Sequence, residues 1–153
     1  LRADSRVCVM EGCNARGLSR GDIGTVDIVV MDVSFISQAL LYPAVCDILR
    51  EGGDFISLIK PQFEVGREHI GGGGIVRDRR AREAAVLHLL ETAADFGLAA
   101  RSLIRSPIEG GDGNIEYLAL FTAAGSAQKL PDGWERRIKE VSGEDKKCCT
   151  DSE

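Results

Sequence analysis

Histidine, aromatic residues and long apolar runs are all scarce in this chain. Only two of its 153 residues are histidines and 5% are aromatic, so we expect a largely aliphatic core. No apolar run approaches the roughly 20 residues that a membrane-spanning helix needs. The first six residues are mostly polar and contain no apolar signal segment. We therefore expect a cytoplasmic protein that has no membrane partner.

Sequence patterns for metal binding and for disulfides are also missing. The five cysteines form no Cys-x-x-Cys pair and have no histidine cluster beside them, so no metal site is predicted. An odd number of cysteines without a disulfide framework is typical of a reducing compartment. Cys8 and Cys46 fall in apolar segments, where we expect them to be small buried residues.

What the chain does contain is an alternation of predicted strands and helices. Apolar runs predict five strands, at residues 6–10, 27–31, 55–59, 99–104 and 115–122. A cap at Ser34 or Ser37 starts a helix that runs to about residue 50, where the glycines at 52–53 end it. Pro43 fits only a first helical turn, so this helix must start late or kink.

A second helix is predicted from a cap at Asp78 to about residue 96. Alternation of strand, helix and strand means parallel pairing, and the short glycine-rich connection between the last two strands requires an antiparallel pair. The expected fold class is therefore α/β. Residues 124–153 form a polar tail, in which we expect a short helix within residues 132–141, Trp134 packed back on the body, and disorder from residue 146.

Three ionisable residues fall at the ends of the predicted strands. Asp32 ends the run Asp27–Met31, and Lys60 ends the run Phe55–Ile59. Parallel strands bring their carboxyl ends to one edge of a sheet, and ligands bind at that edge in open α/β sheets. The last strand runs antiparallel, so Glu116 near its beginning lies at the same edge. We predict that Asp32, Lys60 and Glu116 lie close together there.

A lysine placed between two carboxylates can accept a proton from a hydroxyl group. The ordinary pKa of lysine, about 10.4, makes it a poor base at neutral pH. Burial or a neighbouring cation lowers such a pKa, whereas flanking carboxylates raise it but can orient the amine toward its substrate. The alternative interpretation is an ordinary salt bridge at the edge of the sheet.

Five sequence blocks, in order, resemble one known family. They are VMDVSFIS at residues 30–37, LIKPQFEVGRE at 58–68, GIVRD at 74–78, SPI at 106–108 and GNIEY at 113–117. The series resembles the TlyA-type haemolysin and ribosomal RNA 2'-O-methyltransferase family, which is related to the FtsJ-like methyltransferases. The resemblance covers about residues 1–123.

The resemblance implies a Rossmann-like methyltransferase sheet with an antiparallel final strand. Residues 1–123 would be the carboxyl-terminal part of that domain, without its first two strands and their glycine-rich cofactor loop. The strand at residues 6–10 would then be the third of the family sheet, separated by a gap from strands four, five, seven and six. We expect such a part alone to bind its cofactor weakly and to be inactive.

The resemblance also implies the reaction, which is transfer of a methyl group from S-adenosylmethionine to a ribose 2'-hydroxyl of ribosomal RNA. Family members use a Lys-Asp-Lys-Glu tetrad, whose last three members match Asp32, Lys60 and Glu116; the first lysine would lie upstream of Leu1. Lys60 would take the hydroxyl proton, while Asp32 and Glu116 would position it. The implied partner is ribosomal RNA or a ribosomal subunit.

Four further residues are candidates for ligand contacts. Ser34 and Phe35, together with Asp32, are expected to line the cofactor or substrate pocket, although Ser34 could equally cap a helix and Phe35 could belong to the core. Arg67 and Arg77 flank the glycines at 71–74 and could face RNA phosphates. Residues 58–82 carry a local net charge of +3, whereas the whole chain carries −5. The alternatives are a solvated surface for the arginines and a flexible lid for the glycines.

Two other functions compete with the methyltransferase. One is a non-catalytic RNA-binding or interaction remnant that kept half of the fold but not the chemistry. The other is the membrane activity in the name haemolysin, for which the sequence offers no spanning segment and no strongly basic amphipathic helix. The leading hypothesis is the methyltransferase.

Overall fold

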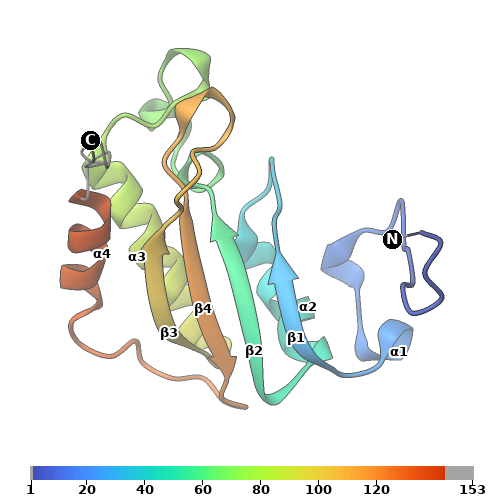
Figure 1. Ribbon diagram of the computed structural model, residues 1–153. Coiled ribbons are helices and arrows are strands. Elements are labelled where there is room, and N and C mark those ends of the chain that lie inside the picture. Colours follow the sequence, from blue (N-terminus) through green and yellow to red (C-terminus); the bar gives the residue numbers. More distant parts are fainter. Residues whose placement is uncertain (1, 144–153) are drawn as a thin grey trace, which may run out of the picture.

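The structure is a computed structural model that describes residues 2–143. Its centre is a four-stranded sheet in the order β1-β2-β4-β3 (Figure 1). The strands are β1 (Val26–Met31), β2 (Leu49–Ile59), β3 (Leu98–Arg105) and β4 (Tyr117–Ala123). β1 pairs with β2 in parallel, and β4 runs antiparallel to both β2 and β3. The predicted α/β class and the antiparallel final strand are confirmed.

Four α-helices and six short 3-10 turns accompany the sheet in the described part of the chain. The helices are α1 (Arg20–Ile23), α2 (Tyr42–Ile48), α3 (Arg79–Asp95) and α4 (Trp134–Gly143). The turns are η1 (Ala15–Gly17), η2 (Gln38–Leu41), η3 (Pro61–Phe63), η4 (Arg67–His69), η5 (Gly72–Gly74) and η6 (Gly111–Gly113). Helices α2 and α3 lie on the same face of the sheet, and α4 lies beside α3 (Figure 1). Among residues 2–143, no helix is long and apolar enough to cross a membrane.

Local signals explain where α2 and α3 begin. Asp78 caps α3, because its side chain accepts a hydrogen bond from the backbone N–H of Arg80. Pro43 lies in the first turn of α2, so this helix starts late, which was one of the two predicted outcomes. The capping serine is Ser37, whose hydroxyl accepts from the N–H of Ala39 in the turn that precedes α2.

The predicted end of the first helix is wrong. Helix α2 stops at Ile48 and β2 follows at once, so the pair Gly52–Gly53 belongs to a strand. The pairing of β1 with β2 shifts register within this stretch. Gly52 has a φ of 72°, and a Cβ on Gly53 would lie 2.8 Å from the carbonyl oxygen of Asp27. The two glycines therefore permit an irregular, closely packed strand rather than a helix end.

The predicted strand at residues 6–10 is also wrong. These residues are irregular, and Val7, Val9 and Met10 are between 38% and 47% exposed. Cys8 is exposed as well, which corrects its predicted burial, whereas Cys46 is half-buried against the core. Within the described chain, no strand lies along the free edge of β1. An apolar run becomes a strand only where another strand can pair with its backbone groups.

The core lies between the sheet and its helices. Most of its members are aliphatic, as predicted, but its largest fully buried side chains are aromatic: Tyr42, Phe55, Tyr117 and Phe121. The rings of Phe55 and Phe121 stack with their centroids 5.3 Å apart. Trp134 and the buried face of α4 pack against this core, which confirms the short helix predicted in the tail. The predicted disorder from residue 146 lies outside the described residues.

The opposite face of the sheet presents apolar side chains outward. Ile28 and Val30 on β1 are 59% and 71% exposed, and Ile56 on β2 and Ile104 on β3 are also exposed. On β2, fully buried Phe55 and Ser57 alternate with the exposed Ile56 between them. Only one of two apolar faces is covered by the helices of residues 2–143.

Candidate active site

Two of the predicted residues are in direct contact where β1 and β2 end. The Nζ atom of Lys60 lies 2.5 Å from an Oδ1 atom of Asp32 and donates a hydrogen bond to the hydroxyl of Ser34 at 3.2 Å. The side chain of Lys60 is only 14% exposed, whereas that of Asp32 is 64% exposed. The amine of Lys60 is thus mostly shielded from solvent, while the carboxylate of Asp32 remains accessible to solvent and to ligands.

Glu116 reaches the same region from the other direction. It directly precedes β4, is buried, and accepts a hydrogen bond from Nε2 of Gln62 at 3.2 Å. Gly110 allows this placement, because a Cβ there would lie 2.3 Å from Oε1 of Glu116. Since Gln62 follows Lys60 by two residues, the contact ties the start of β4 to the turn that follows β2.

A cleft of about 650 Å³ opens at this edge of the sheet. Its first wall consists of residues 34–37, after β1, and residues 60–63, after β2. Its second wall consists of residues from the 67–74 segment and from the 111–116 segment before β4. Lys60 belongs to the first wall and Glu116 to the second. Cavities of this size hold small ligands in other proteins.

Asp32 lies beside this cleft rather than among its lining residues. It lines a neighbouring apolar hollow of about 230 Å³ between β1 and α2, together with Met31 and Val45. The Lys60 amine therefore stands between two concave regions, one lined by both polar and apolar residues and the other mainly by apolar residues.

Phe35 is neither a core residue nor part of a helix. Its φ of 63° lies in the left-handed region, and it is 90% exposed on the first wall. Its ring contacts that of Phe63, with the centroids 4.9 Å apart and the planes tilted by 51°. The alternative that placed Phe35 in the core is thereby excluded, and Ser37 rather than Ser34 is the cap.

A half-buried carboxylate outside the cleft lining supports the first wall. Glu64 accepts hydrogen bonds from the hydroxyl of Ser37 at 2.7 Å and from the N–H of Gln38 at 2.9 Å. Burial raises the pKa of Glu64 above its ordinary value, and these two hydrogen bonds act in the opposite direction. The sequence reasoning assigned no role to Glu64, although it lies in the LIKPQFEVGRE block.

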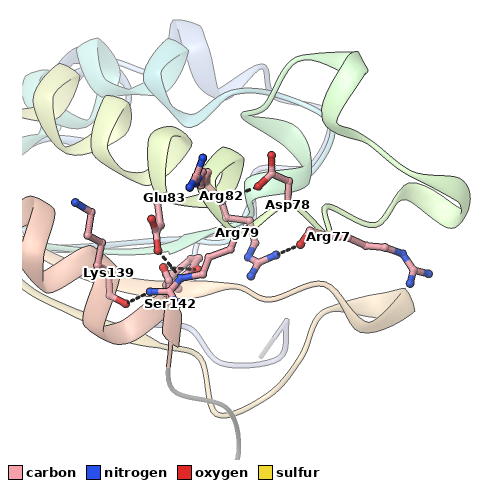
Figure 2. Close-up of polar contacts among 9 residues, drawn as sticks. Arg77, Asp78, Arg79, Arg82, Glu83, Lys139 and Ser142 are labelled. Atoms are coloured by element: carbon pink, nitrogen blue, oxygen red, sulfur yellow. Dashed lines mark hydrogen bonds and ion pairs between the residues drawn. The ribbon is translucent and has the colours of Figure 1, made fainter.

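Two side chains support the second wall, both through backbone groups. Asn114 is buried, accepts from the N–H of Val76 at 3.1 Å and donates to the carbonyl of Gly74 at 3.0 Å. Arg82 of α3 is also buried, and its Nη1 donates to the carbonyls of Val76 at 2.8 Å and Arg77 at 3.0 Å (Figure 2). Neither role could be read from the sequence, because the partners are main-chain atoms.

Only some of the basic side chains of residues 58–82 are available to bind an anion. Arg82 is turned inward, and Arg79 donates to the carbonyl of Lys139 at 2.7 Å and pairs with Glu83 (Figure 2). Arg67 is exposed and lines the cleft, and Arg77 is exposed with its side chain extending away from this cluster (Figure 2). Both arginines that were predicted to face RNA remain accessible.

Comparisons with known proteins agree with this geometry. Residues 1–122 match the family described as FtsJ-like methyltransferase. The chain is 41% identical over 145 residues to the 16S/23S rRNA (cytidine-2'-O)-methyltransferase TlyA of Mycobacterium tuberculosis, covering 92% of this chain and 54% of that protein. It is 37% identical over 123 residues to Hemolysin A of Brachyspira hyodysenteriae, covering 79% and 51%.

A solved structure of a protein described as a hemolysin, from Streptococcus thermophilus, superimposes with a TM-score of 0.85 and 42% identity. The match covers 93% of this chain and 51% of that one. The chain spans about half the length of the curated relatives that it matches. Since the matched part includes every strand of the sheet and both walls of the cleft, this chain belongs to the FtsJ-like methyltransferase family.

Proposed function

We propose that the protein containing this chain transfers a methyl group from S-adenosylmethionine to a ribose 2'-hydroxyl of ribosomal RNA. The observation that carries the proposal is the Lys60 amine, mostly buried, held by Asp32 and placed on a cleft that also contains Glu116. Support comes from relatives whose names state rRNA (cytidine-2'-O)-methyltransferase. Such a substrate would have the protein act in the cytoplasm.

In this proposal Lys60 is the general base. Its amine, in the neutral form, would accept the proton of the 2'-hydroxyl and so make the ribose oxygen nucleophilic enough to take the methyl group. The carboxylate of Asp32, 2.5 Å from the amine, stabilises the ammonium group that results. Glu116, held by Gln62, faces the reacting ribose from the second wall and keeps the hydroxyl in line.

The residues present fit part of a cofactor site. S-adenosylmethionine supplies an electrophilic methyl group on a cationic sulfur. The exposed carboxylate of Asp32 can attract such a cation, the hydroxyl of Ser34 can accept or donate a hydrogen bond, and the apolar hollow beside Asp32 can take an aromatic ring. The exposed ring of Phe35 can stack on a cofactor or substrate base at the mouth of the cleft.

The RNA strand would lie along the second wall. Arg67 on the cleft and Arg77 beside it can neutralise phosphates on either side of the target nucleotide. These contacts would position the strand, while the cleft selects the nucleotide that enters it.

The direct test uses the full-length gene product, ribosomal RNA and S-adenosylmethionine with a tritiated methyl group. We expect label in RNA, at a position that then resists alkaline cleavage because its 2'-oxygen is blocked. Absence of label, with cofactor binding verified by calorimetry, would rule out the proposal. The present chain alone should bind the cofactor weakly and transfer no label, and tight binding to it would contradict that expectation.

A further inference from the structure

Glu64 connects the two segments of the first wall. It follows residues 60–63 directly, and its carboxylate accepts hydrogen bonds from the hydroxyl of Ser37, the last residue of the segment 34–37, and from the N–H of Gln38, the residue after it. A second hydrogen bond lies at the other end of the wall, where the hydroxyl of Ser34 accepts from the amine of Lys60. The turn between Ser34 and Ser37 is therefore held at both ends by the segment that carries Lys60.

Gln38 extends this connection into the sheet. It is 1% exposed, its Nε2 donates to the carbonyl of Leu58, and its Oε1 accepts from the hydroxyl of Ser57. β1 pairs with β2 only as far as Met31 opposite Ser57, so Gln38 occupies the edge of β2 beyond the last paired residue. Glu64 is therefore hydrogen-bonded to a turn that is followed by Gln38, and Gln38 is itself hydrogen-bonded to β2.

Phe35 lies between these anchors in a costly conformation. A left-handed φ in a residue with a large side chain is strained and persists only where its surroundings impose it. Its ring is 90% exposed, so burial does not impose this φ, and within residues 2–143 its aromatic partner is Phe63. The hydrogen bonds to Ser34 and Ser37 on either side are the contacts that can hold this backbone.

The surroundings of Glu64 suit a structural rather than a chemical role for its charge. Its neighbours are the buried phenol of Tyr42 and, more distantly, His88 of α3, and both are part of its electrostatic environment. The carboxylate does not line the cleft. It can act on a ligand only through the wall that it holds.

We propose that Glu64 is a positioning residue that holds the strained turn of Phe35, so that the ring stays at the mouth of the cleft to receive an RNA base. The identity of the ligand rests on the proposed function, whereas the mechanical link between Glu64 and Phe35 does not. A carboxylate that merely capped the turn before α2 would change stability when removed, but it would leave the Phe35 ring where it is.

The link is tested by fluorine NMR on full-length protein labelled with 4-fluorophenylalanine. The Phe35 signal is assigned by its loss in Phe35→Leu. In Glu64→Gln we expect this signal to shift and narrow, because the amide places an N–H against one of the two donors that the carboxylate accepts. The matched control is Glu68→Gln, the same change at an exposed residue four positions later, which should leave the signal unchanged. An unchanged Phe35 signal in folded Glu64→Gln overturns the proposal.

If Glu64→Gln does not fold, Ser37→Ala decides the question, because it removes one of the two donors and leaves the carboxylate in place. The same shift and narrowing, in smaller measure, is then expected, and an unchanged signal overturns the link.

Enzyme kinetics test separately whether the link between Glu64 and Phe35 serves RNA binding. Glu64→Gln should raise the KM for RNA on the order of tenfold, as expected for loss of one stacked base, with kcat within about twofold. Adding it to Phe35→Ala should change KM no further, because the ring on which it acts is already gone. If the two substitutions raise KM additively, Glu64 does not act on RNA binding through Phe35, and this part of the proposal is overturned. If wild-type protein methylates no RNA, the proposed function fails, and the fluorine signals still decide whether Glu64 holds Phe35.

Discussion

The two walls of the cleft are held in place in different ways. In the first wall, charged and polar side chains bind one another across segments that follow neighbouring strands, as Lys60 binds Asp32. In the second wall, Asn114 and Arg82 bind main-chain groups of residues 74–77. A glycine-rich segment has few side chains with which to fix itself, so its path must be set by side chains from elsewhere. The supports of the first wall thus include Lys60, which is proposed to act in the reaction, whereas Asn114 and Arg82 only fix the path of the backbone in the second wall.

The largest effect is expected from Lys60→Ala in the full-length protein. Removing a general base should lower the methyl-transfer rate by roughly a hundredfold to ten-thousandfold. Stability should change little, because Asp32 is 64% exposed and is not left as a buried charge. Single-turnover methylation assays and thermal unfolding measure the two effects. Lys129→Ala, at a separate hollow that Trp134 also lines, is the control, and retention of most of the rate by Lys60→Ala would remove Lys60 from the base role.

Asn114→Ala should loosen the second wall. It removes the partner of the carbonyl of Gly74 and leaves the buried N–H of Val76 unpaired, which should cost about 1–3 kcal/mol in the free energy of unfolding. Urea unfolding measures the loss. Asn14→Ala, in an exposed turn, is the matched control and should cost clearly less. Equal losses in both variants would mean that Asn114 does not support this wall.

Charge reversal tests whether the second wall meets RNA. Arg67→Glu and Arg77→Glu should each weaken RNA binding and lower the slope of log affinity against log salt by about one. Arg101→Glu on β3 makes the same change at an exposed position away from the cleft and should leave the slope unchanged. Filter binding over a range of salt concentrations distinguishes them. Equal slopes in all three variants would make Arg67 and Arg77 ordinary surface arginines.

The smallest effect concerns pH and the support of the first wall. Burial raises the pKa of Glu64 in the folded protein above its ordinary value of 4.5. Between these two pKa values the folded state binds more protons than the unfolded state, so the free energy of unfolding falls as pH rises through that window. Glu64→Gln lacks this titration. The free energy of unfolding of wild-type protein, measured relative to that of Glu64→Gln, should therefore be highest below pH 4.5 and fall as pH rises through the raised pKa of Glu64. Urea unfolding across pH measures this difference. The opposite trend would contradict a pKa of Glu64 that desolvation raises.

The residues of the candidate site were predictable to different degrees. Asp32 and Lys60 end apolar runs, and the direction of the strands sufficed to bring them together. Glu116 required the antiparallel final strand as well, and it reaches the same cleft. Gln62, Glu64 and Arg82 could not be assigned roles, because each contacts atoms far away in the sequence or in the main chain.

The errors in the predicted fold have a common cause. The apolar run at residues 6–10 satisfied the local pattern of a strand, yet it has no neighbouring strand in the described chain. The Gly52–Gly53 pair satisfied the local pattern of a helix end, yet it lies in a strand that passes close to Asp27. In both places the decisive contact comes from another part of the chain.

The sequence by itself determined where the strands β1 and β2 end, which residues cap α3, and that an aspartate and a lysine stand at one edge of a parallel pair. These features depend on short-range periodicity, capping and strand direction, which are properties of neighbouring residues. Only the tertiary structure decided which apolar face of the sheet is covered, which arginine is buried, and how the exposed ring of Phe35 is held. Those outcomes depend on hydrogen bonds and packing between segments many residues apart, and such contacts exist only once the chain has folded.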